Sequence, residues 1–469
     1  MKGPVKEISF PVFHQDRFFF IMEERGISSG GMFALCLEGE WLDPDRFIAA
    51  VARMMDRNPK CASRIVRVSS FLGERFYWEP LPNAASRACC FHEPDPALKD
   101  RETLEALIQD LMNVRLNMES APPVVFHWFP YGDREGLLTF RFNHALCDGH
   151  GGLLLTKELL CLYNGIPIDA DVPGPYTPRA PMVEGTLFFK LRLFLRGIAF
   201  HLRKLFRYRF AVPEKLYDLS NRSRGELETL FLHITTHRLR RWLTTARGMG
   251  ATLNDLLMAA FAAAIRRWKE EQGLRCGTIR FVVNQSLRHE GQHYPGSENR
   301  SSSFPVWVGP RDRHEPKAMV HDLHRQAQEA LRLRIAEATN LLGVVLKLPY
   351  SIARRLLAPL MNNPRISDSC IITNVGMFAT SEDEGGGWFR LGQGRIVKFY
   401  PGGRPTDGIG AICLLISIPE GAVLSFMGMK GLLKRPEMER LTQLVETTLD
   451  ELASTNAAQD GQPGRGGTL

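Results

Sequence analysis

The sequence lacks the features that mark several classes of protein. It has no long hydrophobic run, since the most apolar late segment, residues 409–418, is too short to span a bilayer and stops at Pro419. It has no Walker-type phosphate loop and no nucleic-acid-binding motif. An early Pro4 and Glu7, with no long apolar core beside them, argue against a signal peptide. We therefore expect a cytoplasmic protein that binds no nucleic acid.

The sequence also lacks any grouping of cysteines. The nine cysteines are scattered, only Cys89 and Cys90 are adjacent, and there is no Cys-x-x-Cys pair. No ligand spacing typical of a zinc site is present either. We interpret the cysteines as small buried residues in a reducing cytosol, and we expect no bound metal.

What the sequence does contain is the composition of an ordinary folded protein with an excess of positive charge. Of its 469 residues 44% are hydrophobic and 23% are charged, and the net charge is +8. This length suits two or three domains, or two lobes around one cleft. Because the basic residues are spread along the chain, the charge favours an anionic small molecule or an acidic partner over nucleic acid.

Strand-like and helix-like segments alternate and divide the chain into four parts. Residues 1–165 and 226–453 have similar element content and predict two α/β lobes, with a ligand site at their junction. Residues 166–225 predict a proline- and glycine-rich linker followed by a basic helix that crosses between the lobes. The small, polar, glycine-rich tail at 454–469 is expected to be disordered.

The basic apolar segment at 187–209 leaves two interpretations open. Bulky apolar and cationic residues alternate along it, which is consistent with peripheral contact with a membrane surface. Its basic residues do not form one clean face, which favours a crossover helix packed on the fold. We favour the crossover helix, and association with a membrane surface stays open.

The segment Asn143-His144-Ala145-Leu146-Cys147-Asp148-Gly149 is the most informative part of the chain. It follows an apolar run that predicts a strand and precedes one that predicts a helix, so it places an imidazole at the rim of a sheet. A neutral imidazole there can act as a general base. Asp148 can hold the loop through backbone bonds or an arginine. A metal site is disfavoured because Gly149 and the preceding strand argue against the continuous helix that such spacing needs.

Five segments, in order along the chain, resemble signatures of the CoA-dependent acyltransferase superfamily. That superfamily includes chloramphenicol acetyltransferase, the condensation domains of peptide synthetases, wax ester synthase/diacylglycerol acyltransferases and alcohol acetyltransferases. Residues 143–149 are similar to its HHxxxDG signature. The other four segments are Arg57-Asn58-Pro59 followed by Arg64, Thr252 to Leu257, Phe281 to Arg288 with Glu298-Asn299-Arg300, and Thr373-Asn374-Val375-Gly376. The segment that contains Asn254-Asp255 looks most like the alcohol acetyltransferase and wax ester synthase branch.

The sequence departs from the family pattern at two places. The first histidine of HHxxxDG is Asn143 here, whereas the second, catalytic histidine is kept as His144. Nothing matches the DFGWG segment found in the acyltransferases of plant secondary metabolism, and residues 399–403 occupy a comparable position only loosely. The second departure points away from that branch.

The resemblance implies two chloramphenicol-acetyltransferase-like lobes, each a mixed sheet with flanking helices, and an active-site tunnel at the lobe interface. It also implies an acyltransferase that moves an acyl group from a phosphopantetheine thioester to the hydroxyl or amine of a small-molecule or lipid-like acceptor. The donor is acyl-CoA or an acyl carrier protein thioester, both anionic, and no cofactor is bound permanently. We expect a monomer.

The resemblance further implies roles for individual residues. His144 would be the catalytic base, and Asn143 could orient its imidazole or the acceptor. Thr373 and Asn374 would line the side of the cleft where the oxyanion forms. Asp148, together with Gly149, would support the motif structurally, through an ion pair with Arg288 or, as second choice, with Arg64.

Two alternatives remain at this point, and a third pattern is set aside. A stand-alone condensation-type enzyme would share the histidine but use substrates bound to carrier proteins. A catalytically degenerate relative would act only as a binding or scaffold protein, for which Asn143 is the motivation. Gly26-Ile27-Ser28-Ser29-Gly30 fits the G-x-S-x-G pattern, but the segment that follows it predicts a strand rather than the helix of a nucleophile elbow, so we interpret Ser28 as a loop residue.

Overall fold

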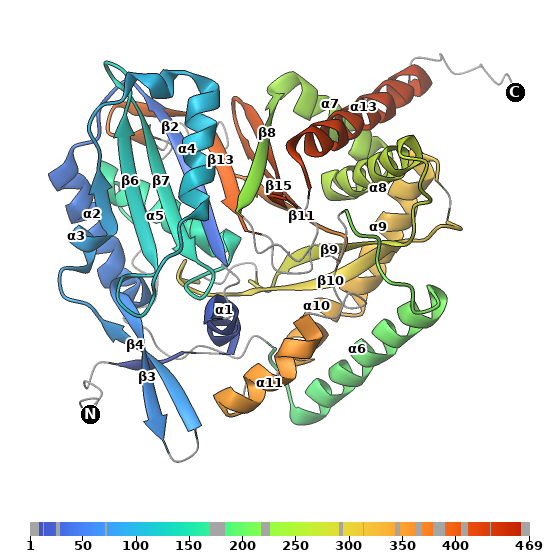
Figure 1. Ribbon diagram of the computed structural model, residues 1–469, viewed down its shortest axis with the longest axis horizontal. Helices are drawn as coiled ribbons and strands as arrows, with labels where there is room; N and C mark the ends of the chain where they lie inside the picture. The colour runs from blue at the N-terminus through green and yellow to red at the C-terminus, as the bar shows by residue number, and fades with distance from the viewer. Residues whose placement is uncertain are drawn as a thin grey trace, which may run out of the picture.

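The computed structural model shows two α/β lobes that lie side by side, with their sheets facing a common junction (Figure 1). It describes residues 9–12, 14–24, 29–70, 73–168, 183–216, 226–289, 294–312, 314–342, 348–361, 368–378, 390–404, 411–431 and 433–460. The predicted two-lobed α/β architecture is confirmed. Ser28 lies outside the described residues.

The N-terminal lobe is built on a six-stranded mixed sheet with the strand order β12-β13-β2-β7-β6-β5. The helices α2 and α5 cover one face of this sheet, and α4 packs on the other face. A separate three-stranded sheet, β1-β4-β3, lies beside α1. The first elements of the lobe are β1 (Phe10–Pro11), α1 (His14–Glu24), β2 (Gly30–Glu38), α2 (Pro44–Arg57), η1 (Pro59–Ala62), β3 (Ser63–Ser70) and β4 (Gly73–Pro80). They are followed by α3 (Ala84–Ala88), β5 (Cys89–Phe91), η2 (Pro96–Lys99), α4 (Arg101–Asn113), β6 (Val124–Pro130), β7 (Glu135–Asn143) and α5 (Gly149–Asn164).

The C-terminal lobe is built on a second six-stranded mixed sheet, with the strand order β10-β9-β11-β14-β15-β8. The helices α7, α8, α9 and α13 contribute to the apolar cluster on its outer face. Its strands are β8 (Leu227–Thr235), β9 (Ile279–Ser286), β10 (Ser301–Val308), β11 (Cys370–Met377), β14 (Ala411–Ile418) and β15 (Gly421–Met429). Its helices are α7 (Thr236–Gly248), α8 (Leu253–Glu271), α9 (Pro316–Arg332), α10 (Ile335–Leu342), α11 (Tyr350–Met361) and α13 (Arg435–Asp460).

Helix starts follow the capping chemistry of the sequence. Asp43 caps α2 by accepting from the Arg46 N–H at 3.0 Å, and Pro44 occupies the first turn. Thr252 and Asp255 form a reciprocal capping box at the start of α8. The carboxylate of Asp255 also contacts His324 Nδ1 at 2.8 Å, which ties α8 to α9.

One pair of strands crosses the predicted boundary between the lobes. Residues 226–453 were expected to belong to the C-terminal lobe, but β12 (Arg390–Leu391) and β13 (Gly394–Gly403) extend the N-terminal sheet. β13 pairs antiparallel with β2 from Arg395↔Glu38 to Gly403↔Gly31. β12 pairs only with the start of β13, and among the described residues no strand pairs with that edge of β13 beside Pro401, a position that suits a residue without an N–H.

A buried apolar layer joins the two lobes. Side chains alternate along the inner strands, so β14 directs Ile412 and Leu414 toward this layer and Cys413 and Leu415 toward the outer helices. The layer includes Met32 from β2, and polar contacts reinforce it, since the Ser425 hydroxyl donates to the Pro401 carbonyl at 2.6 Å. Its buried members are Met32, Ala34, Cys36, Leu98, Leu104, Ile108, Leu111, Met112, Phe129, Leu137, Leu227, Phe231, Tyr400, Ile412, Val423 and Met427.

The segment between the lobes contains the predicted helix. α6 (Leu187–Arg207) packs one face against α10, where a Cβ added at Gly197 would lie 2.7 Å from the Ala338 Cβ. The disordered tail predicted from residue 454 begins too early, because α13 continues to Asp460. Residues 454–460 contain few helix breakers, which allows the helix to propagate beyond its buried part. Residues 461–469 lie outside the described part of the chain.

Among the described helices, none alone has the length and apolarity needed to span a bilayer. The pair α7 and α8 passes the same test together, but the two helices meet at a bend of 99°.

Candidate active site

His144 is the first residue after β7, in a short turn that leads into α5. β7 ends at Asn143, which is paired with Gly30 of β2, and the backbone N–H of His144 donates to the Ser29 carbonyl at 2.8 Å. The half-buried imidazole lies between two aromatic rings: Phe19 of α1 stacks on it with a centroid distance of 5.0 Å, and Phe142 meets it edge-on at 5.8 Å. The imidazole is therefore fixed from two sides.

The hydrogen bond at Nδ1 sets the tautomer of His144. Nδ1 lies 3.1 Å from the Cys147 carbonyl oxygen, which can only accept, so Nδ1 carries the proton when the ring is neutral. Nε2 then keeps its lone pair, as a general base requires. Burial lowers the pKa of His144, against smaller opposing effects of the Cys147 carbonyl and the Asp148 carboxylate. The ring is consequently neutral at pH 7.

Asp148 anchors the turn to both lobes. One carboxylate oxygen accepts from the Gly151 N–H at 2.7 Å and so caps α5. The other accepts from Arg288 Nη1 at 2.9 Å and from the backbone N–H of Arg300 at 2.7 Å, both in the C-terminal lobe. The first-choice ion pair between Asp148 and Arg288 is thus present, whereas Arg64, the second choice, pairs with Glu79 at 2.7 Å.

The segment before β10 grips the same turn from the C-terminal lobe. Asn299 Nδ2 donates to the His144 carbonyl at 2.7 Å and also contacts Asp16 at 3.0 Å. Arg288 donates to the Glu298 carbonyl at 2.9 Å. The family-like Glu298-Asn299-Arg300 segment marked this region, but nothing in its pattern predicted that the Asn299 amide would bond to the backbone of the His144 turn.

The close approach of the lobes requires a glycine, but not at position 149. Gly149 begins α5, and a Cβ added there would meet no atom within 4 Å. A Cβ at Gly151 would lie 2.4 Å from the Gly296 carbonyl oxygen, and one at Gly152 would lie 2.8 Å from the Phe142 ring. Asp148, Gly151 and Gly152 therefore give the structural support that was expected from Gly149.

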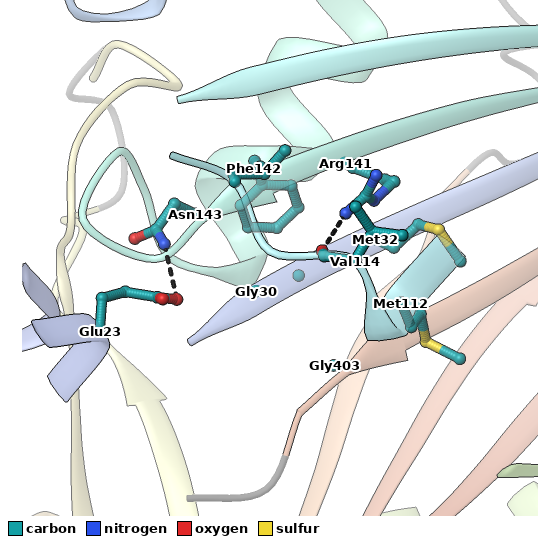
Figure 2. Close-up of a pocket in the computed structure, with 11 residues that line it drawn as sticks. Glu23, Gly30, Met32, Met112, Val114, Arg141, Phe142, Asn143 and Gly403 are labelled. Carbon is teal, nitrogen blue, oxygen red and sulfur yellow. Dashed lines mark hydrogen bonds between the residues drawn. The ribbon is translucent and has the colours of Figure 1, made fainter. Parts of the chain in front are cut away.

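Asn143 replaces a histidine of the family signature and has a fixed position. Its Oδ1 accepts from the Ala145 N–H at 2.8 Å, which shapes the turn, and its Nδ2 donates to Glu23 Oε1 at 2.9 Å (Figure 2). Glu23 also accepts from the Ser29 N–H at 2.7 Å. Sequence reasoning missed Glu23, because α1 precedes the motif by 120 positions and carries no matching signature.

A narrow pocket opens beside Asn143, with a volume of about 20 Å³. Figure 2 shows Asn143 and Glu23 at one end of it and Met32, Met112 and Gly403 at the other. Arg141 also lines it and donates to the Val114 carbonyl. His144 is not among the lining residues, and the described residues define no tunnel that reaches it, so the tunnel at the lobe interface stays a prediction.

Thr373 and Asn374 lie on β11 in the C-terminal lobe. Thr373 Oγ1 accepts from Asn284 Nδ2 at 3.1 Å, and Asn374 Oδ1 accepts from the Gly376 N–H at 2.9 Å beside a bulge in the strand. Within the described residues, neither is hydrogen-bonded to His144. Their proposed oxyanion role stays a prediction. Among all the residues that the structure describes, no group of three or more His, Cys, Asp or Glu side chains could hold a metal ion.

The two-lobed architecture has counterparts among solved structures. The first condensation domain of the CDA synthetase is 14% identical, covers 96% of this chain and 97% of its own, and has a TM-score of 0.70. The trichothecene 15-O-acetyltransferase of Fusarium sporotrichioides is 11% identical, covers 95% of each chain and has a TM-score of 0.70. The chain has a condensation-domain and acyltransferase-like fold. Polyketide synthase associated protein 5 from Mycobacterium tuberculosis shares this fold at 14% identity, with coverages of 95% and 98% and a TM-score of 0.62.

Sequence similarity to known proteins covers less of the chain than structural similarity does. No family model matches the chain. Two curated relatives, both uncharacterized proteins from strains of Mycobacterium tuberculosis, are 28% identical over 234 residues, which is 48% of this chain. The match spans half the length of those relatives. The fold is therefore established by structure, and the reaction is a separate question.

Proposed function

We propose that the protein is an acyltransferase that moves an acyl group from a phosphopantetheine thioester to an acceptor hydroxyl or amine. The observation that carries this proposal is the His144 turn. Its imidazole is neutral and protonated on Nδ1, and it leaves Nε2 as the basic nitrogen. The fold shared with an acetyltransferase and with condensation domains supports the same class of reaction.

The reaction follows from the chemistry of a neutral imidazole. Nε2 of His144 takes the proton of the acceptor as the acceptor oxygen or nitrogen attacks the thioester carbonyl carbon. The resulting oxyanion collapses, the carbon–sulfur bond breaks, and the imidazolium returns its proton to the leaving thiolate. The products are an ester or amide and a free thiol, and no covalent acyl-enzyme forms. Thr373 and Asn374 remain our candidates for stabilising the oxyanion.

In this scheme three residues hold His144 in position and take no part in proton transfer: Phe19, Asn299 and Asp148. Phe19 restricts water at one face of the imidazole, and Asn299 fixes the backbone from the opposite lobe. Asp148 does not touch the ring but holds the turn through Arg288. Attack within the junction would therefore depend on both lobes keeping their relative position.

The direct test measures release of free thiol from acyl-CoA in the presence of a broad panel of alcohols and amines. His144→Ala should lower the rate by about 10²–10⁴-fold, the usual contribution of general base catalysis, while the circular dichroism spectrum stays unchanged. His150→Ala is the matched control, because this exposed histidine lies in the first turn of α5. Full activity of the His144→Ala variant would contradict the mechanism.

A condensation-type reaction is the second candidate, favoured by the similarity to condensation domains over 96% of the chain. It would use the same base but take its acyl group from a carrier protein. Acyl-carrier protein and acyl-CoA carrying the same acyl group should be compared as donors at equal concentration. A large preference for the carrier protein would select this candidate. Absence of thiol release with either donor across the acceptor panel would instead indicate a binding protein without catalysis.

A further inference from the structure

The helix α6 has two faces with different environments, and acyl transfer uses neither. Leu193, Gly197, Phe200 and Lys204 recur at helical spacing and are its buried residues. Lys204 Nζ donates to Gln326 Oε1 at 3.1 Å, which ties this face to α9. The inward face therefore fixes α6 on the C-terminal lobe, as the crossover interpretation requires.

The outward face of α6 carries a ridge of large apolar side chains. At 100° per residue, these positions lie opposite the buried stripe. Their exposed fractions are large: 75% for Phe188, 52% for Leu191, 55% for Leu195, 46% for Leu202 and 66% for Phe206. Single exposed apolar residues are common, but a continuous row of five on one helix is typical of an interaction surface.

A row of arginines runs beside this apolar ridge. Arg192, Arg196, Arg203 and Arg207 follow the spacing i, i+4, i+11 and i+15, which places them on one adjoining strip of the helix. Lys190 and the buried Lys204 lie off this strip, so the arginines alone form the row. Arg203 contacts Glu329, and Arg207 lies 3.7 Å from Asp312. Among the described residues, Arg192 and Arg196 make no ion pair.

We propose that the outward face of α6 binds an anionic lipid surface. The apolar ridge would enter the boundary between headgroups and acyl chains, and the arginine row would contact lipid phosphates. α6 has 21 residues and so is about 32 Å long, and it runs along the lower edge of the molecule in Figure 1. A ridge that runs along most of the helix matches a flat surface better than the concave groove of a protein partner.

The charge of the molecule favours an anionic surface over a neutral one. The net charge of +8 attracts anionic bilayers over a distance of about one Debye length, and the arginine row then orients the ridge toward the surface. The proposal does not depend on the proposed acyl transfer. Because the His144 turn lies on another part of the molecule, membrane binding and thiol release can be measured separately.

The experiment is flotation of the full chain with vesicles of phosphatidylcholine alone or with about one-third phosphatidylglycerol. We expect binding to the anionic vesicles only, and weaker binding as salt is raised. Arg192→Gln/Arg196→Gln should weaken binding about 30-fold, because each arginine near an anionic surface contributes about 1 kcal/mol and a tenfold change corresponds to about 1.4 kcal/mol. Leu191→Gln/Leu195→Gln/Phe206→Gln should reduce binding by about 100-fold or more.

The matched control is Arg240→Gln/Arg247→Gln on α7, which removes the same charge from exposed positions elsewhere. This variant should keep the binding of the parent chain. Equal weakening by both arginine pairs would show a general charge effect and overturn the proposal, as would unchanged binding of the ridge variant. Dimers in sedimentation that the ridge substitutions abolish would overturn it in favour of a second copy of this chain. Thiol release with a soluble acceptor should be the same in all of these variants, so failure here is distinguishable from failure of the proposed function.

Discussion

The His144 turn and helix α6 differ in whether their side chains find partners inside the protein. In the turn, the polar groups of Asp148 and Asn143 are paired inside the protein, with partners from both lobes. On α6, one face is packed on the C-terminal lobe, while the opposite face presents apolar side chains that nothing in the described residues covers. The contrast teaches that the turn is constrained from within the fold, whereas the outward face of α6 has no such constraint among the described residues.

The largest effect is expected where the internal constraint is strongest. Arg288→Met leaves the Asp148 carboxylate, only 4% exposed, without its cationic partner, which costs about 3–5 kcal/mol of the free energy of unfolding. Urea denaturation followed by circular dichroism measures this loss. Arg64→Met provides the matched control, because its ion pair with Glu79 is more exposed and is expected to contribute only about 0–1 kcal/mol. Equal losses for the two variants would show that the clamp is no stronger than a surface ion pair.

The two faces of α6 allow a comparison within one helix. Leu193→Ala removes a side chain that is 2% exposed and should lower the free energy of unfolding by about 2–5 kcal/mol, from lost burial and the cavity left behind. Leu195→Ala, at a position 55% exposed, should change it by less than about 0.5 kcal/mol. Thermal unfolding of both variants in the absence of vesicles measures the difference. A large loss for Leu195→Ala would mean that its face is already covered in the free protein.

The sequence predicted most of the elements of this fold but not how every strand is placed. The alternation of strand-like and helix-like segments predicted two α/β lobes, because these signals are local. β13 was missed, since Pro401 and two glycines interrupt its apolar pattern, and its place in the N-terminal sheet depends on pairing with β2, which lies more than 350 positions earlier. Long-range pairing of this kind leaves no mark in a local window.

In the candidate site, too, contacts within recognisable motifs were predicted, whereas contacts made by tertiary packing were not. The pair between Asp148 and Arg288 was expected from the resemblance to a family, not from composition or spacing. Glu23 and Phe19 could not be expected, because α1 has no family-like signature and reaches the turn only through tertiary packing. The arginine row on α6, by contrast, is present in the sequence at helical spacing, and it becomes evident once the buried stripe fixes the orientation of the helix.

The smallest expected effect concerns the pH dependence of the turn. Burial lowers the pKa of His144, so the neutral base persists below the usual range of histidine, and the acidic limb of kcat/KM should lie below pH of about 6.5. Folding stabilises the neutral form of a group with a lowered pKa. The stability contributed in this way is therefore present above the unfolded pKa and is lost as the pH falls through the folded value.

Phe19→Ala should admit water to one face of the imidazole and move the acidic limb of kcat/KM upward, toward the ordinary value. Phe18→Ala is the matched control, because this neighbouring ring on α1 meets Phe19 edge-on at a centroid distance of 5.4 Å and does not stack on His144. The measurement is thiol release as a function of pH for the parent chain and both variants. A lower rate with an unmoved acidic limb in the Phe19→Ala variant would assign Phe19 to packing alone. A shift shared by both variants would trace the effect to α1 as a whole. Only a shift confined to Phe19→Ala would show that aromatic burial sets the protonation of the base.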